Sequence, residues 1–316
     1  MESINMLVKP KIRELLDKIE QIKPYLASIG YKLNQANTRE AMANMAYLYM
    51  TDYNKMLFTL DDVVMNGHYP VPIRIYHPQP GTPLPVAIFI HGGGHMAGGI
   101  TVYDGIVRKL SATINHIVIS IDYRLAPEFA YPTGIEDSKA AIRGVFKVLE
   151  ERKIAYTSRE LTLIGDSAGA AVCSSIAMDK EFVVVEQIKK QVLIYPSVDY
   201  TLSSPSFAQY GSGYLLEKSK IAWYFESYFQ HNEDRKAASP VYGEFYVGMP
   251  QTLVVVASHD PLIAEGMAYY QNVINVGVNA ELLKIDGVVH AYLMLENLCK
   301  EECDVTYQEI NKFLLK

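Results

Sequence analysis

The 316-residue chain contains only three cysteines, an odd number that excludes a framework of paired disulfides. It lacks the roughly 18 consecutive apolar residues that a membrane span requires, and Lys9, Lys11 and Arg13 interrupt its N-terminus where a signal peptide would be apolar. The formal net charge of −6 is spread without long runs of one sign, which argues against a nucleic-acid or polybasic membrane partner. We therefore expect a soluble, cytoplasmic protein with no stable membrane association.

Short apolar runs alternate with longer segments of helical periodicity from about residue 61 onward. Several of the runs are continuously apolar, as in strands that are covered on both faces. The runs are 71–76, 86–90, 117–121, 161–164, 192–195, 252–256 and 281–285, and the helical patterns are 103–113, 135–152, 168–180, 262–276 and 298–315. This alternation predicts an α/β fold with a mostly parallel central sheet flanked by helices.

Two segments depart from this alternation. In the first fifty-odd residues, apolar side chains recur at helical spacing from Val8 to Leu26 and again from Met42 to Tyr49. Gly30 is a stop signal between them, and Pro24 is an alternative position at which the first helix ends earlier or is kinked. Residues 203–240 are rich in aromatic side chains but show no strand pattern. We expect both segments to be helical, and the apolar stripe of the first helix to be narrow enough to be buried.

A candidate nucleophile lies in residues 165–169 (GDSAG), directly after the run 161–164 and before a helical pattern. A turn this tight between strand and helix holds the hydroxyl of its central residue, Ser167, clear of both elements, and the flanking glycines avoid collisions with their neighbours. The pattern is typical of the nucleophile elbow of α/β-hydrolases. The alternative is a tight turn with an incidental serine.

Residues 91–94 (HGGG) follow the run 86–90 and predict a loop that binds a developing negative charge. Consecutive glycines let backbone N–H groups approach a reacting carbonyl oxygen, and Ala168 offers a further N–H at the start of its helix. We expect His91 to hold the loop by hydrogen bonding. Residues 92–97 also fit the loose dinucleotide pattern G-x-G-x-x-A, with Asp122 ending the next strand, but no helix begins at once and the serine turn stays unexplained.

A nucleophilic serine needs a base, and the base needs an acid that orients it. In this type of site the chain order is serine, acid, histidine. His290 is the histidine that satisfies this order, since the others precede Ser167, lie in a charged stretch (His231) or precede the best acid (His259). The histidines that precede Ser167 are His68, His77, His91, His95 and His116.

The acid must lie between Ser167 and His290, at the carboxyl end of a strand. Asp260 fits directly after the run 252–256, and we favour it. Asp199, one strand earlier, is the main alternative, because some hydrolases place the acid there. Asp286 is too near His290 in sequence, and Glu265 lies one turn into the following helix.

Together these motifs resemble the bacterial hormone-sensitive-lipase-like esterases, from about residue 60 to the C-terminus. The motifs are residues 91–94 (HGGG), 123–128 (YRLAPE), 165–169 (GDSAG), 260–262 (DPL) and 287–290 (GVVH). The resemblance implies an α/β-hydrolase fold, Asp260 as the acid, and oxyanion hydrogen bonds from Gly93, Gly94 and Ala168. It also implies that Arg124 anchors a loop by ion pairing, with Asp137 part of that structural block. His95 and Ala170 depart from the family pattern, which has an aromatic residue and a glycine there.

The resemblance further implies a helical cap over the site, built from the N-terminal helices and an insertion after the sixth core strand. We therefore expect N-terminal cap helices in 1–56, a core in 57–202 and 241–316, and a cap insertion in 203–240. The implied activity is that of a serine carboxylesterase acting on a small-molecule acyl ester without metal or organic cofactor. A deacetylase or amidase with the same residues is an alternative, and a homodimer stays open. A non-catalytic receptor on this fold is also left open, although receptors of this kind lack the catalytic histidine, which is present here as His290.

Tyrosine and methionine are unusually frequent in the expected cap segments. They are Met42, Met45, Tyr47, Tyr49, Met50, Tyr210, Tyr214, Tyr224 and Tyr228. Such side chains present apolar bodies with polar or adaptable ends, and they favour a confined pocket for short- to medium-chain acyl groups. Cys173 is expected to be buried, and Cys299 and Cys303 are expected to pack rather than to bind metal.

Overall fold

The computed structural model describes residues 7–50, 55–56 and 58–316 of the chain. Its centre is an eight-stranded sheet in the order β1-β2-β4-β3-β5-β6-β7-β8. The strands are β1 (Phe58–Asn66), β2 (Tyr69–His77), β3 (Leu84–Ile90), β4 (Ile117–Ile121), β5 (Tyr156–Asp166), β6 (Ile188–Ile194), β7 (Gln251–His259) and β8 (Ala280–Val289). Only the pairings of β2 with β1 and with β4 are antiparallel, so the sheet is mostly parallel, as predicted.

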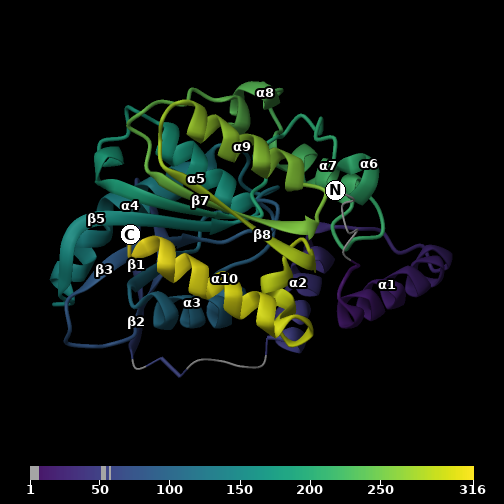
Figure 1. Cartoon of the computed structure of the whole chain (residues 1–316), viewed down its shortest axis with the longest axis horizontal. Coiled ribbons are helices and arrows are strands. Elements are labelled where there is room, and N and C mark those ends of the chain that lie inside the picture. Colours follow the sequence, from purple (N-terminus) through teal and green to yellow (C-terminus); the bar gives the residue numbers. More distant parts are fainter. Residues whose placement is uncertain (1–6, 51–54, 57) are drawn as a thin grey trace, which may run out of the picture.

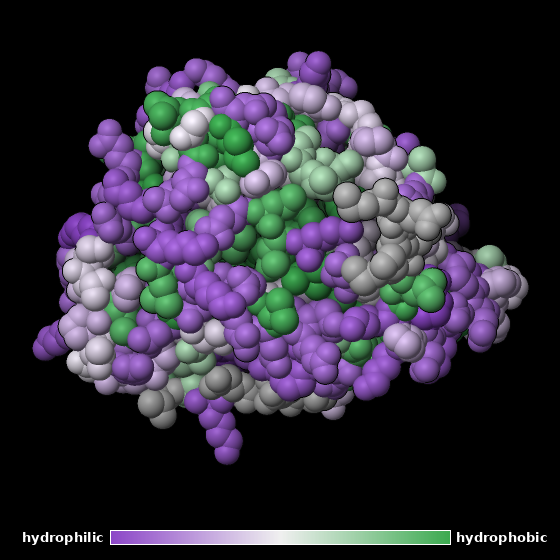
Figure 2. All heavy atoms as spheres, viewed as in Figure 1, coloured by the Kyte–Doolittle hydropathy of each residue, from purple (hydrophilic) through white to green (hydrophobic). Residues whose placement is uncertain are grey.

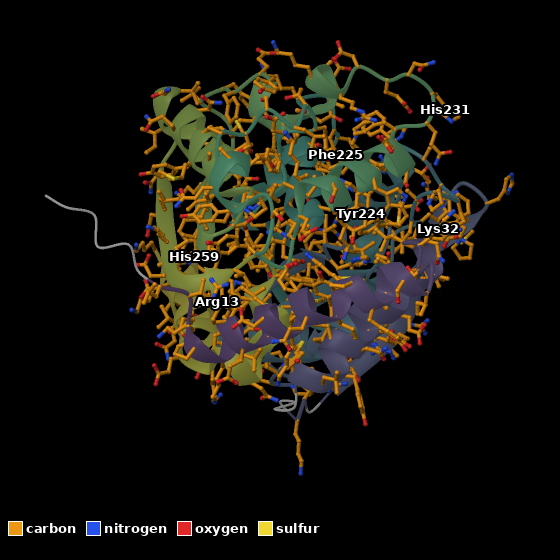
Figure 3. All side chains as sticks on the ribbon, turned by 90° about the vertical axis from the view of Figure 1, so that its right-hand side faces the viewer. Arg13, Lys32, Tyr224, Phe225, His231 and His259 are labelled. Atoms are coloured by element: carbon orange, nitrogen blue, oxygen red, sulfur yellow. The ribbon has the colours of Figure 1, made fainter. Side chains whose placement is uncertain are left out.

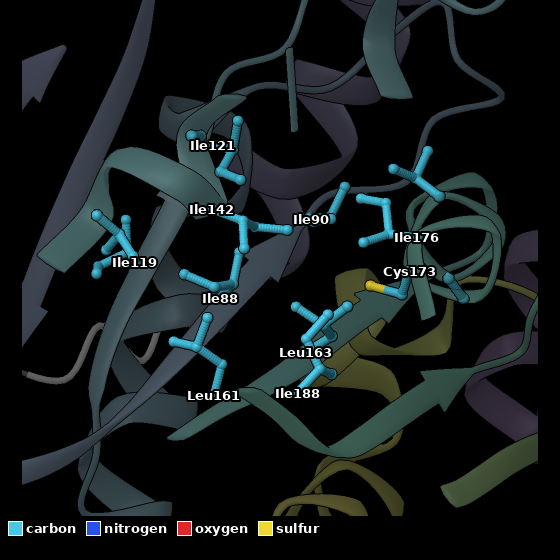
Figure 4. Close-up of a cluster of buried hydrophobic side chains, with 14 of the residues drawn as sticks. Ile88, Ile90, Ile119, Ile121, Ile142, Leu161, Leu163, Cys173, Ile176 and Ile188 are labelled. Carbon is cyan, nitrogen blue, oxygen red and sulfur yellow. The ribbon is translucent and has the colours of Figure 1, made fainter. Parts of the chain in front are cut away.

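Helices cover both faces of the sheet (Figure 1). One face carries α4 (Thr133–Glu151), α5 (Ala168–Met178) and α9 (Ile263–Asn275), and the other carries α3 (Ile100–Ile114) and α10 (Lys300–Leu314). Successive side chains of a strand point to opposite faces. Thus Ile88 and Ile90 of β3 belong to the apolar core under α4 and α5, which Figure 4 shows, whereas Phe89 belongs to the core under α3 and α10. Burial on both faces explains the continuously apolar runs.

The strand β1 is missing from the sequence-based prediction, which begins its strands at residue 71. Asp61 and Asp62 interrupt the alternation of apolar residues in this edge strand. The structure pairs Asp61 with Arg74 on the neighbouring strand, at 2.5 Å, and Asp62 with Arg152 at the end of α4, at 2.6 Å. These partners lie far apart in the sequence, so local periodicity could not reveal them.

The N-terminal segment forms α1 (Pro10–Ser28) and α2 (Gln35–Tyr49). Helix α1 continues through Pro24, so the earlier of the two predicted stops is wrong. The expected burial of the α1 apolar stripe is correct for Ile12 and Leu16 but wrong in the second half, where Ile22 is 49% exposed and Leu26 is only partly buried. Only the first turns of α1 pack on the core, and there the N–H of Lys9 donates a hydrogen bond to the carbonyl of Gly287 at 2.8 Å. The second half of the helix extends beyond the sheet (Figure 1).

The segment between β6 and β7 contains α6 (Phe207–Tyr210), α7 (Lys218–Tyr228) and α8 (Arg235–Ala238), followed by the short 3₁₀ helix η2 (Pro240–Tyr242). Further 3₁₀ helices are η1 (Val185–Gln187) and η3 (Tyr292–Leu298). Ile221, Tyr224 and Phe225 of α7 share an apolar cluster with Met96 and Leu262, which belong to loops after β3 and β7. Helix α7 therefore packs over loops at the carboxyl end of the parallel strands, and Figure 3 shows Tyr224 and Phe225 at this end, above the N-terminal helices.

The strand β8 forms one edge of the sheet. In the view of Figure 1, β8 lies between α9 and α10 on the side of the molecule that faces the viewer. Figure 2 shows apolar side chains near the centre of the same view. Leu282 and Leu283 of β8 are only partly buried. Across the described ranges, no helix has both the length and the apolar character needed to cross a membrane.

Candidate active site

Ser167 lies in the turn between β5 and α5 with φ +51° and ψ −119°. This strained conformation costs on the order of 1–3 kcal/mol and is held by its surroundings: the N–H of Ser167 donates to the carbonyl of Ile194 at 2.8 Å. A Cβ on Gly165 would lie 2.6 Å from the backbone of Gly169, and a Cβ on Gly169 would lie 2.0 Å from the carbonyl oxygen of Ile90. Both flanking glycines are therefore required by close backbone approach.

The structure brings Ser167, His290 and Asp260 together from the ends of three different strands. Nε2 of His290 is 2.9 Å from Oγ of Ser167, and Nδ1 of His290 is 2.7 Å from Oδ2 of Asp260. The other carboxylate oxygen of Asp260 accepts a hydrogen bond from the N–H of Leu262 at 2.8 Å, which fixes the orientation of this buried side chain. With its proton on Nδ1, the His290 ring donates to Asp260 and accepts from the hydroxyl of Ser167.

The alternative acids serve other contacts. Asp199 accepts hydrogen bonds from the N–H and hydroxyl of Thr201 (2.9 and 2.6 Å) and from the hydroxyl of Ser203 (2.7 Å), so it stabilises its own loop. Glu265 accepts from the N–H groups of Val198 and Asp199 at 2.8 and 3.2 Å, and burial raises its pKa well above the usual range of a carboxyl group. The hydrogen bonds of both side chains tie down the loop after β6.

The glycine loop lies beside Ser167. Gly93 and Gly94 have φ values of +105° and +64°, and a Cβ on Gly94 would lie 2.4 Å from the ring of Tyr224. The loop is fastened to the serine turn because the N–H of Gly92 donates to Oδ1 of Asp166 at 2.7 Å. Oδ2 of Asp166 accepts from the hydroxyl of Tyr103 at 3.0 Å, and burial raises the Asp166 pKa to about 6.

Three backbone N–H groups at this place are available to a ligand. They belong to Gly93, Gly94 and Ala168, and within the part of the chain that the structure describes no hydrogen bond uses them. Ala168 is the first residue of α5, where the helix dipole also favours negative charge. These are the groups that the family resemblance implies as oxyanion donors.

His91 and His95 are buried and act through packing. Nδ1 of His91 contacts the carbonyl of Gly92 at 2.8 Å, and its ring stacks on Tyr123, so it holds the glycine loop as expected. The ring of His95 stacks on Tyr228 with centroids 3.8 Å apart, and its Nε2 lies 3.1 Å from the hydroxyl of Tyr200. Because burial lowers the pKa of His95 to about 3, the ring is neutral near pH 7 and fills the place of the usual aromatic residue.

Two further residues from the sequence analysis have structural roles. Oδ1 of Asp122 accepts a hydrogen bond from the N–H of Ile100 at 3.2 Å, in the first turn of α3, a contact that accounts for its position without a dinucleotide. Arg124 forms hydrogen bonds of 2.8 and 2.7 Å with the two carboxylate oxygens of Asp137, the ion pair that the resemblance implies. Both contacts fix the loop after β4.

A cavity of about 350 Å³ lies over Ser167 and His290, between the glycine loop and the helices α1, α2 and α7. Met42, Met45, Tyr49 and Tyr224 line it, as expected from the cap composition. The other expected residues point elsewhere. Tyr47 is exposed, Met50 lies in the core, Tyr210 and Tyr214 contact His259, and Tyr228 stacks on His95.

Sequence analysis does not identify several residues that line the cavity. They are Leu15, Ile19, Thr38, Leu215, Leu216 and Lys220. Apolar residues and a lysine on an amphipathic helix carry no local signal that distinguishes a cavity wall from a packed or solvated face. Among the described residues, no three His, Cys, Asp or Glu side chains gather in a way that could hold a metal ion. The three cysteines are buried, with the sulfur atoms of Cys299 and Cys303 3.9 Å apart.

Comparison with known proteins agrees with this geometry. Residues 87–294 match the model of a family described as having the α/β-hydrolase fold. Esterase LipI of Mycobacterium tuberculosis is 31% identical over 293 residues, which cover 90% of this chain and 89% of the relative. Ethyl acetate hydrolase of Pseudomonas putida is 30% identical over 75% of each chain.

A solved structure of similar shape is a hyperthermophilic esterase from the archaeon Pyrobaculum calidifontis. It superimposes with a TM-score of 0.86 at 27% sequence identity, over 97% of each chain. The similarity therefore extends over the sheet, its helices and the segments around the cavity. By family model, relatives and architecture, this chain belongs to the α/β-hydrolase fold family of esterases, as its hormone-sensitive-lipase-like motifs predict.

Proposed function

We propose that this chain is a serine carboxylesterase that hydrolyses short- to medium-chain acyl esters through Ser167, His290 and Asp260. The observation that carries the proposal is the continuous chain of hydrogen bonds from Oγ of Ser167 through the His290 ring to Asp260, at 2.9 and 2.7 Å. Esterase relatives over most of the chain support ester hydrolysis. The intact His290 also argues against a non-catalytic receptor on this fold.

In the acylation step, Nε2 of His290 accepts the hydroxyl proton of Ser167 while Oγ attacks the ester carbonyl carbon. The carbonyl π electrons move to oxygen, and the N–H groups of Gly93, Gly94 and Ala168 stabilise the oxyanion. As the tetrahedral intermediate collapses, the bond to the alcohol oxygen breaks and Nε2–H of His290 protonates that oxygen. Asp260 stabilises the transient imidazolium.

In the deacylation step, a water molecule replaces the alcohol. His290 removes one proton from this water, whose oxygen attacks the acyl carbon. A second tetrahedral intermediate forms in the same oxyanion site. Its collapse breaks the bond to Oγ of Ser167, which recovers its proton from His290, and the carboxylic acid leaves. Acylation moves a proton from Ser167 to His290, and deacylation returns a proton from His290 to Ser167.

We assign residues 1–56 and 203–240 to a cap over this site, and residues 57–202 and 241–316 to the hydrolase core; of these, residues 1–6, 51–54 and 57 lie outside the described residues. The positions of α2 and α7 support this division, since both contribute to the cavity wall. Helix α2 is tied to the glycine-loop region because Nε of Arg39 donates to the carbonyl of Met96 at 2.9 Å. Arg39 also pairs with Glu128 at 2.7 Å.

The limited volume of the cavity, about 350 Å³, predicts the acyl length that the enzyme prefers. Each methylene gains about 0.8 kcal/mol only while apolar wall remains to bury it, so kcat/KM should rise and then fall, with its maximum at acyl chains of roughly two to eight carbons. The measurement is kcat/KM for 4-nitrophenyl esters from C2 to C16. We expect no jump in rate above the solubility limit, because Ser167 is already partly exposed to the cavity.

The same panel contains the contrary outcome. A maximum at C12 or longer, or a sharp rise once the substrate forms an interface, would identify a lipase that opens onto lipid and would contradict the small-pocket proposal. The exposed apolar residues on the second half of α1 make this comparison below and above the solubility limit essential.

A further inference from the structure

The wall of the catalytic cavity contains one lysine, Lys220, on the helix α7. Its amino nitrogen lies 5.7 Å from the ring centroid of Tyr224, which lines the same cavity. The nearby carboxylate of Glu217 is engaged by Lys23 at 2.5 Å. Within the described residues, no Asp or Glu carboxylate forms an ion pair with Lys220, and burial lowers the pKa of its amino group. Lys220 is therefore a partly buried amino group that has no ion pair among the described residues and that feels Glu217 only at longer range.

Most residues that share the cavity wall with Lys220 are apolar, whereas the outer groove that Lys220 also lines contains Glu20, Lys23 and Glu217. The side chains that line the cavity near the cap include Leu15, Ile19, Met42, Met45, Leu48, Leu215, Leu216 and Ile221. The acid in the lining, Asp166, is already held by the N–H of Gly92 and the hydroxyl of Tyr103. A cation in such a wall loses part of its hydration, and a bound molecule that supplies negative charge compensates for that loss.

A second polar group in the wall also lacks a partner. Thr38 of α2 is 3% exposed, its hydroxyl forms no hydrogen bond in the structure, and its side chain lines the cavity. An unpaired buried hydroxyl is costly, on the order of 1–3 kcal/mol. The ligand that fills this cavity can satisfy the hydroxyl if it carries hydrogen-bonding oxygen atoms at a distance from the reacting carbonyl.

We propose that the ester substrate carries a carboxylate remote from its scissile bond, and that Lys220 binds this carboxylate in the cavity. The inference rests on the proposed esterase function of the same site. Lys220 also borders an outer groove that Ile19, Leu215 and Trp223 line together with Glu20, Lys23 and Glu217. Lys23 pairs with both carboxylates of this groove, at 2.6 and 2.5 Å. We therefore place the carboxylate of the substrate at Lys220 on the cavity side, with the ester at Ser167. Lys220 acts as a specificity determinant and takes no part in the proton transfers.

The wild-type enzyme tests the proposal with esters of matched length and different charge. The acyl series is monoethyl adipate, ethyl hexanoate and ethyl 6-aminohexanoate, with ethanol release as the readout. We expect kcat/KM to be highest for the anionic ester and lowest for the cationic one. A second pair, 4-acetoxybutanoate and butyl acetate, places the carboxylate on the alcohol side and shows which half of the substrate reaches Lys220.

The two possible failures are distinguishable. If no ester in either series is hydrolysed, the proposed function is wrong. If the neutral esters are hydrolysed and neither anionic ester is preferred over its neutral partner, the esterase function stands and the carboxylate proposal is overturned.

Variants at Lys220 give the sharper test. Since a hydrogen bond to a charged group is strong in a desolvated site, Lys220→Met should lower the anionic-to-neutral ratio of kcat/KM by about 10- to 100-fold. The change should appear mainly as a higher KM for the anionic ester, because Lys220 binds ground state and transition state alike. Lys220→Arg, which keeps the charge, should retain most of the preference.

A matched control lies on the same helix. Lys218 is exposed, contacts the ring of Phe207 at 5.1 Å and does not line the cavity, so Lys218→Met should leave the ratio within about twofold of wild type, as expected of a surface charge. Residual activity on the neutral ester shows that each variant is folded. An unchanged ratio in Lys220→Met, or an equal loss in Lys218→Met, would overturn the assignment of Lys220.

Discussion

Ser167→Ala and His290→Ala are each expected to lower kcat by about 10⁴-fold or more. The first removes the atom that forms the acyl-enzyme, and the second removes the base 2.9 Å from it. Because both residues act in one proton-transfer unit, the double variant should be scarcely slower than either single one. The measurement is kcat with 4-nitrophenyl butyrate, with thermal unfolding to verify that the variants fold. Losses that multiply in the double variant would show that the two residues act independently.

Asp260→Asn is expected to lower kcat by about 10²- to 10⁴-fold. Asparagine can still accept the hydrogen bond from the N–H of Leu262, but it removes the charge that steadies the imidazolium and fixes the tautomer of His290. The measurement is kcat of the variant against wild type on the same ester.

The matched control for Asp260 is Asp199→Asn, which alters another buried carboxylate one strand earlier in the chain. The Asp199 carboxylate accepts hydrogen bonds from Thr201 and Ser203 within its own loop. We therefore expect Asp199→Asn to lower the free energy of unfolding and to change kcat by less than about tenfold, as for a residue with a structural role. The opposite ranking of the two variants would transfer the role of the acid to Asp199.

Elements that are buried on both faces could be predicted from the sequence, because there the local pattern reflects the tertiary environment directly. The predicted apolar runs lie in the strands β2 to β8, except that the run 192–195 extends one residue beyond β6, and only the edge strand β8 among them is mostly half-buried. The edge strand β1 could not be found in this way, since Asp61 and Asp62 are stabilised by arginines from other elements. The exposure of the second half of α1 was also unpredictable from local pattern, because periodicity specifies a helix but not how far the core extends beneath it.

The order of the motifs along the chain led to Ser167, Asp260 and His290, and the structure places these residues within hydrogen-bonding distance. The cavity wall was less predictable, because composition gives the type of side chain in a cap helix but not its direction. Tyr49 faces the cavity and Tyr47 faces solvent, although both belong to α2. The sequence does not distinguish Lys220 from a surface lysine, because its place in the cavity wall depends on the positions of α1 and α2 relative to α7.

Covalent trapping at Ser167 tests the central claim most directly. The chain would be incubated with a 4-nitrophenyl alkylphosphonate, which transfers its phosphonyl group to an activated serine, and analysed by intact-mass and peptide mass spectrometry. We expect one adduct per chain, located on Ser167, with stoichiometric loss of esterase activity and no adduct in Ser167→Ala. Full esterase activity without modification of Ser167, or an inactivating adduct on a different residue, would contradict the account.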